Sequence, residues 1–261
     1  MRPFLTARLF LTGVRTQFWL VRREPDALLT LCTIPFTVVM VLSIVVHAAR
    51  PDLIATAFLA PALMGLWGFS VGLASEVVVG ERWNRTLDLG MASPSSLQPV
   101  YLGRISAVMV LGVVPLGETW LLGRLLFGVT PEVHHPWVFW AAMAVSVFAM
   151  TGTSLLLAAG LLLSNNGHVY VNFLSYPIYL LSGVLVPVHH LPEFLRPLSH
   201  AVFLSWSADL MRDAMAPAPV AGPGWRLLVI GGLAVAALVG GRVLLALTLR
   251  RARELGTVTY A

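Results

Sequence analysis

The chain has 261 residues, of which 57% are hydrophobic and 11% are charged, and its mean hydropathy is +0.83. About a quarter of the residues of a soluble domain are charged, so this composition excludes an ordinary soluble domain and indicates a single membrane domain. All 17 basic residues are arginine and most lie at the ends of apolar segments, which excludes a Gly-Lys-Ser/Thr phosphate-binding loop and does not indicate a nucleic-acid-binding face.

Residues 1–23 are predicted to form an amphipathic helix that lies in the headgroup region of the membrane. Arg2, Arg8, Arg15, Arg22 and Arg23 are interleaved with apolar and aromatic residues, which is typical of an interfacial helix. A cleaved signal peptide is the alternative, but no uninterrupted apolar core precedes Arg15 and a full apolar segment follows at once.

The apolar segments that follow predict six membrane-spanning helices of about 20 residues each. They cover residues 27–48, 53–75, 101–127, 137–163, 169–187 and 226–249. The third segment is interrupted by Pro115, Glu118 and Arg124. Cys32, the only cysteine, lies in the first segment, so no disulfide can form within the chain.

The arginines predict the orientation of these helices, because cytoplasmic flanks of membrane spans are enriched in basic residues. Eleven of the 17 arginines lie before the first span, around the second connection and after the last span. Five lie on the opposite side when Arg124 is counted there. We therefore expect both termini in the cytoplasm.

The second cytoplasmic connection, residues 80–94, is polar, contains Trp83 and Leu87 at helical i,i+4 spacing, and ends in Ser93-Pro94 before the third span. From the residues alone it is either a solvated loop or a short docking helix.

This stretch resembles the coupling region of the ABC type-2 membrane family, the permease subunits of bacterial exporters such as those for daunorubicin resistance and nodulation. Glu81, Thr86, Leu87, Ser93 and Pro94 match the family pattern, whereas Arg85 stands where the family usually has glycine. The resemblance implies a short cytoplasmic helix that docks on an ATPase. The implied coupling residues are Glu81, Arg82, Trp83, Arg85, Thr86, Leu87, Asp88, Ser93 and Pro94.

The outer connection before the last span also resembles this family, in residues 182–187, 191–197 and 210–212. The resemblance implies extracellular re-entrant half-helices over residues 188–225, and an ordinary amphipathic outer loop is the alternative. Pro192 suits the first turn of a short helix whose apolar face would hold Leu191, Phe194, Leu195 and Leu198. The whole chain, 1–261, is then one transmembrane domain, with spans one to five in 24–187 and the last span and tail in 226–261.

Polar residues within the spans are candidates for a transport path, because such groups usually face a partner helix or water. Asn172, Tyr176 and Tyr179 are predicted to share one face of the fifth span, and Glu118 is an acid within the third. Hydrogen bonding between helices is the alternative for each. The histidines map almost entirely to the outer side in loops, so we expect no metal site.

The resemblance implies a permease subunit that forms a substrate path as a homodimer or with a similar chain, in a bacterial inner membrane. It has no catalytic residues and no cofactor of its own, because ATP and Mg²⁺ would bind to separate ATPase subunits. A drug, natural product, lipid or lipid-linked glycan would be the substrate. The alternatives are a secondary transporter, which would need inverted repeats, and a membrane-embedded enzyme, which would need clustered acids or histidines.

Overall fold

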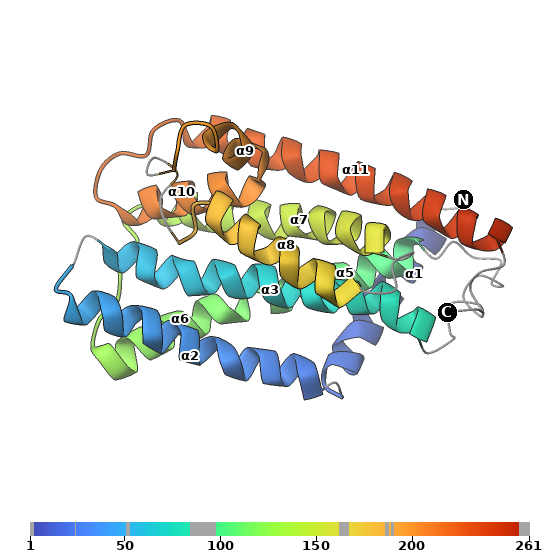
Figure 1. Cartoon of the computed structure of the whole chain (residues 1–261), viewed down its shortest axis with the longest axis horizontal. Coiled ribbons are helices and arrows are strands. Elements are labelled where there is room, and N and C mark those ends of the chain that lie inside the picture. The colour runs from blue at the N-terminus through green and yellow to red at the C-terminus, as the bar shows by residue number, and fades with distance from the viewer. Residues whose placement is uncertain are drawn as a thin grey trace.

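The computed structural model describes residues 3–23, 25–50, 53–83, 98–161, 167–185, 188 and 191–255. Within these residues the chain forms α-helices joined by short connections, and they contain no β-strand. Most of the long helices run side by side along the long axis of the molecule (Figure 1). The all-α fold expected from the composition is confirmed.

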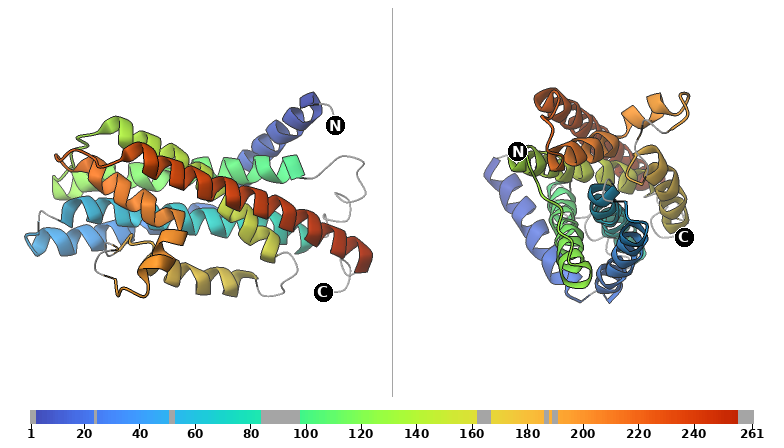
Figure 2. Two further views of the ribbon diagram at one scale, coloured as in Figure 1. Left: turned by 90° about the horizontal axis from the view of Figure 1, so that it is seen from above. Right: turned by 90° about the vertical axis from the view of Figure 1, so that its left-hand side faces the viewer.

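The N-terminal segment is a helix, α1 (Pro3–Val21), and it packs against α5 (Gln98–Leu111). The two helices cross at Gly13 and Gly103, where an added Cβ would overlap a backbone carbonyl oxygen of the other helix. Close by, the Nε of Arg104 donates a hydrogen bond of 2.9 Å to Oε1 of Gln17. Figure 2 shows α1 leaving the bundle at an angle.

Four helical segments are long and apolar enough to cross a membrane, and they correspond to the second, third, fourth and sixth predicted spans. They are Ile54–Gly72, Gln98–Phe127, Pro136–Leu161 and Pro223–Thr248. The first predicted span corresponds to α2 (Pro25–His47), whose apolar part within the described residues, Cys32–His47, is shorter. The fifth corresponds to α8 (Gly167–Leu181), which has 15 residues. The count of six spans stays a prediction.

The third span is broken into α5 and α6 (Val114–Phe127). The break follows from Pro115, which has no amide hydrogen to donate to the preceding turn and occupies the first turn of α6 instead. The predicted single span 101–127 is therefore two helices, and α6 continues without a break through Glu118 and Arg124.

The fifth span ends at Leu181, before the predicted end at residue 187. Gly183 has φ +67°, a left-handed conformation that commonly terminates helices. Two short helices then precede the last span, α9 (Arg196–Ala201) and α10 (Phe203–Met215).

The predicted start of the first short helix at Pro192 is wrong. Residues 192–195 form a turn, and α9 begins at Arg196 because Pro197 is the proline in its first turn. Leu191 is buried, whereas Phe194 and Leu198 are exposed, so the expected apolar residues do not all pack inward.

Helix α7 (Pro136–Leu161) lies at the centre of the packing and contacts α3 (Ile54–Trp83), α5, α10 and α11 (Pro223–Leu255). Gly152 of α7 and Gly241 of α11 allow a close approach, because a Cβ on either would come within 2.8 Å of backbone atoms of the other helix. Small residues at such contacts are typical of helix packing in membranes, where close backbone approach supplies the attraction.

Helices α3 and α11 extend well beyond the predicted spans. With 30 and 33 residues, they are about 45 and 50 Å long, compared with about 30 Å for the hydrocarbon layer. Each is therefore longer than the hydrocarbon layer is thick. The C-terminal ends of α3 and α11 lie at the same end of the molecule as the start of α1 (Figure 1).

Candidate functional site

The predicted coupling segment begins on α3. The backbone of Glu81, Arg82 and Trp83 forms the last residues of this helix rather than a separate loop. The remaining predicted coupling residues fall in 84–97 and lie outside the described residues. They are Arg85, Thr86, Leu87, Asp88, Ser93 and Pro94. The docking role of this segment stays a prediction.

The residues predicted to share one polar face of α8 point in different directions in the structure. Tyr179 faces α3 and donates a hydrogen bond of 3.2 Å to the carbonyl oxygen of Met64. One turn earlier, Nε1 of Trp67 donates a bond of 3.1 Å to Oγ of Ser175. Tyr176, by contrast, is 76% exposed. Asn172 lies on the α8 backbone, and its side chain is outside the described part of the chain.

Tyr176 belongs to an exposed stripe along α8 that repeats at helical spacing. The stripe consists of Val169, Phe173, Tyr176 and Leu180. Large apolar side chains of a membrane helix that have no partner within their own chain face either lipid or another subunit. One side of α8 is therefore hydrogen-bonded to α3, and the opposite side, which carries this stripe, is free to contact lipid or another subunit.

Glu118 lies on α6, which packs against α2 and α3. Its Oε2 atom is buried and has no hydrogen-bond partner among the described residues. Tyr179, by contrast, lies on α8, and α6 and α8 pack against different parts of the bundle apart from their shared neighbour α3. The described contacts do not bring the predicted path residues into one cluster.

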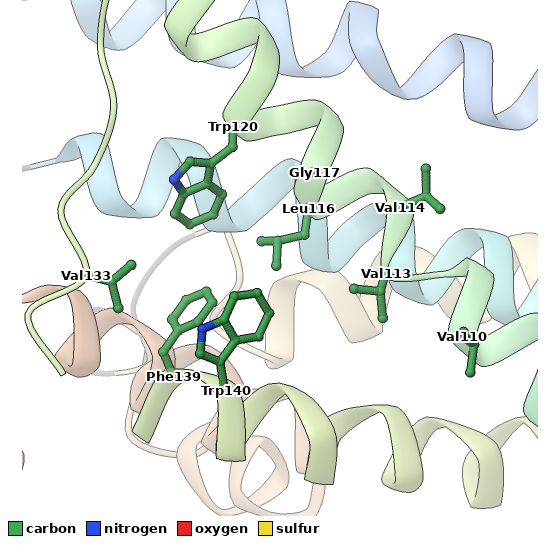
Figure 3. Close-up of a pocket in the computed structure, with 9 residues that line it drawn as sticks. All are labelled: Val110, Val113, Val114, Leu116, Gly117, Trp120, Val133, Phe139 and Trp140. Atoms are coloured by element: carbon green, nitrogen blue, oxygen red, sulfur yellow. The ribbon is translucent and has the colours of Figure 1, made fainter. Parts of the chain in front are cut away.

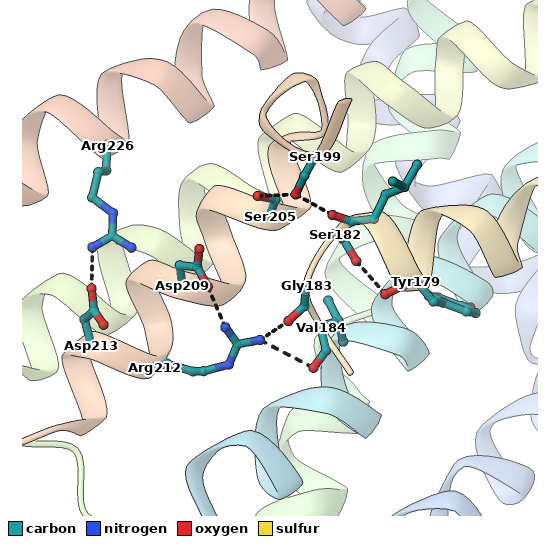
Figure 4. Close-up of polar contacts among 11 residues, drawn as sticks. Tyr179, Ser182, Gly183, Val184, Ser199, Ser205, Asp209, Arg212, Asp213 and Arg226 are labelled. Atoms are coloured by element: carbon teal, nitrogen blue, oxygen red, sulfur yellow. Dashed lines mark hydrogen bonds and ion pairs between the residues drawn. The ribbon is translucent and has the colours of Figure 1, made fainter. Parts of the chain in front are cut away.

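A polar cluster in the connection predicted to lie outside, named the outer polar cluster for that reason, joins α10 to the end of α8 and to α11 (Figure 4). Arg212 donates to Oδ1 of Asp209 at 2.6 Å and to the carbonyl oxygens of Gly183 and Val184. Asp213 accepts a bond of 2.5 Å from Arg226 of α11. The cluster therefore connects three segments that are far apart in the sequence.

These charged groups border a cavity of about 500 Å³ that is also lined by Val188, Arg196 and His200. Burial raises the pKa of Asp209, although the charge of Arg212 acts in the opposite direction. Burial likewise lowers the pKa of Arg212, against the effect of Asp209. For both partners, the cost of losing water exceeds the attraction between the charges.

Sequence reasoning missed this cluster. Its only local signal is the spacing of Asp209 and Arg212 at i,i+3, which suits a helical ion pair. The acceptors on Gly183 and Val184 are backbone atoms, and Arg226 lies beyond a loop, so neither could be read from the spacing.

The histidines in the described residues make structural contacts. His134 and His135 bond to the carbonyl oxygens of Met215 and Ala218, which ties the connection before α7 to the end of α10. The ring of His200 lies 5.2 Å from that of Trp206. Within the described residues, no three His, Cys, Asp or Glu side chains are grouped as a metal site.

A family model for ABC-2 type transporters matches residues 8–216, from α1 to the end of α10. The chain belongs to the ABC-2 type transporter family. It is therefore a multi-pass membrane protein and the permease component of an ABC transporter, whose membrane domain is a transport subunit without catalysis of its own. A comparison with curated proteins found no match. The family match favours the permease interpretation over a secondary transporter or a membrane-embedded enzyme.

Proposed function

We propose that this permease forms one side of the substrate path of an ATP-driven exporter, with a second copy or a similar chain opposite it. Separate ATPase subunits bind ATP and Mg²⁺, since the chain has no lysine for a phosphate-binding loop. The family match is the observation that carries this proposal. The protein would lie in a bacterial inner membrane with both termini in the cytoplasm. A drug, natural product, lipid or lipid-linked glycan would be its substrate.

The proposed path runs along the exposed stripe of α8. Support comes from the length of this stripe and from the side chains opposite it, which are held to α3 by the bonds of Ser175 and Tyr179. In this arrangement Tyr176 contacts substrate, while Tyr179 fixes the position of the helix. Asn172 and Glu118 complete the proposed set of path residues.

The proposed coupling element starts at the C-terminal end of α3. An ATPase that moves Glu81 or Trp83 would move the whole of this continuous helix, because a helix transmits axial displacement along its length. Since α3 packs against α2, α6, α7 and α8, such a shift reaches both the stripe and the broken span.

The test is the double substitution Trp83→Ala with Leu87→Ala. An interface anchor of this kind costs about 2 kcal/mol or more when truncated, which weakens binding more than about tenfold. We expect normal abundance in the membrane but loss of the co-purified ATPase and of substrate efflux.

The control is Arg85→Gly, which restores the residue usual in the family and should retain the ATPase. If the double variant keeps its ATPase and transports at the normal rate, the segment is a plain loop and the coupling proposal is wrong.

A further inference from the structure

A second cavity lies beside the break in the third span, between α6 and α7 (Figure 3). Its volume is about 570 Å³. The side chains that line it are apolar, apart from the indole N–H groups of two tryptophans, and include Val110, Val113, Leu116, Trp120, Phe139 and Trp140. It is separate from the α8 stripe and from the outer polar cluster, because none of its lining residues belongs to either.

The break in the span creates this cavity. Helix α5 ends at Leu111 and α6 begins at Val114, so the side chains on either side of the break no longer follow one continuous surface. Gly117 leaves part of the wall bare, because an added Cβ there would meet no atom within 4 Å. Phe139 packs edge-on against Trp120 and Trp140, with ring centroids 5.9 and 5.5 Å apart, which gives the cavity a firm aromatic side.

The cavity lies at the depth of the hydrocarbon layer. It follows the span Gln98–Phe127 from Val110 to Trp120, a helical rise of about 15 Å, or half of the hydrocarbon thickness of about 30 Å. Trp140, in the second turn of α7, lies toward the membrane surface, where tryptophan is enriched.

The mouth of the cavity opens to the surface of the bundle rather than to its interior. Val110, Val114 and Trp140 are 59%, 40% and 58% exposed, and all three line the cavity. At this depth the surrounding medium is lipid chains and not water. The walls of an empty apolar cavity in such a medium would lack dispersion contacts. A lipid chain that entered the cavity would supply these contacts, and it would not have to leave water to do so.

A helix from another subunit would not fit this cavity. A helical segment 15 Å long and about 10 Å wide occupies about 1,200 Å³, roughly twice the volume available here. An unbranched hydrocarbon chain is narrower than a helix. The cavity extends about 15 Å along the span, which matches the hydrocarbon thickness of one leaflet.

We propose that this cavity binds one acyl chain of a phospholipid from the leaflet at the Phe127 and Pro136 end of the bundle. The aromatic rings of Trp120, Phe139 and Trp140 hold the chain, and the headgroup stays at the surface beyond Trp140. The bound lipid fills the gap beside the break and so supports α6 against α7.

The experiment uses the full chain in vesicles of phosphatidylethanolamine and phosphatidylglycerol that include a phosphatidylethanolamine with a photoreactive acyl chain. No transported compound is added. We expect crosslinks, located by mass spectrometry, to concentrate on Val113, Val114 and Trp140.

Gly117→Leu places a side chain in the open space of the cavity. It should reduce these crosslinks at least about fivefold, which corresponds to about 1 kcal/mol in the occupancy of the site. The matched control is Gly232→Leu on α11, where an added Cβ also meets no atom within 4 Å, and its crosslinks should be unchanged.

Thermal unfolding in detergent checks that Gly117→Leu is folded, and Val114→Trp at the exposed rim serves as a second filling variant. Crosslinks spread evenly over all lipid-exposed residues, or unchanged in both filling variants, would overturn the proposal. Crosslinking that occurs only with a photoreactive transported amphiphile, and not with the phospholipid, would overturn it as well.

Discussion

Asp209 and Arg212 form a partly buried ion pair in which both charges lose part of their hydration. Burial raises the pKa of Asp209 and lowers the pKa of Arg212, which favours the neutral form of each residue in spite of the attraction between them. Such pairs contribute little net stability, but removal of a single partner leaves the other charge unpaired and incompletely hydrated. The role of this pair is therefore positional: through Arg212 it holds α10 against the carbonyl oxygens of Gly183 and Val184.

Arg212→Met should lower the free energy of unfolding by about 1–2 kcal/mol, because hydrogen bonds to a charged group are lost while water still screens the partly exposed Asp209. The double variant Asp209→Leu with Arg212→Met should cost less than this single change. Thermal unfolding in detergent measures both.

Arg226→Met is the control for these variants. Its partner Asp213 has a side chain that is 50% exposed, so the effect should be about 1 kcal/mol or less. A double variant as unstable as the sum of its two single changes would contradict the positional role.

At the scale of a helix, α8 separates a bonded side from an exposed side. The sequence predicted a helix with one polar face here, but it grouped Tyr176 with Tyr179 because spacing alone cannot distinguish adjacent edges of a face. The position of α3, which accepts the bond from Tyr179 and donates to Ser175, divides the two. Ile178, next to Tyr179 in the chain, also packs against the core.

We predict that Tyr176→Cys, in a Cys32→Ser background, reacts with a water-soluble maleimide and that its rate changes when the ATPase is trapped with ATP. Ser175→Cys should be protected by Trp67. Val235→Cys, on an α11 residue that is 52% exposed, should stay inert because it faces lipid. Equal reaction at residues 176 and 235 would show that the α8 stripe is not a water-accessible path.

At the scale of the whole molecule, the described ends of α1 and α11 lie at one end of the bundle, and the connection 128–135 lies at the other (Figure 1). A reporter that is active only outside the cytoplasm should give no signal when fused after Ala261. The same reporter inserted after Pro131 should give a strong signal. The reverse pattern would invert the membrane orientation and place the coupling segment on the wrong side.

Composition and periodicity were enough to predict the helical class and the four segments that meet the length for crossing, and they marked Pro115 as an interruption of the third one. These features depend on local residues, such as a proline without an amide hydrogen. The outer polar cluster and the cavity beside the break could not be predicted. The first depends on backbone oxygens at 183 and 184, and the second on the empty space beside Gly117.

The glycine crossing between α1 and α5 has a consequence for the synthesis of the protein. About 90 residues separate Gly13 from Gly103, and a ribosome that adds about 5–20 residues per second makes them in roughly 5–18 s. During this interval α1 lacks α5, the helix it packs against most, and an amphipathic helix can lie at the membrane surface. Helix α1 is therefore made before the spans that follow it, yet it can complete its packing only after the third span has been made.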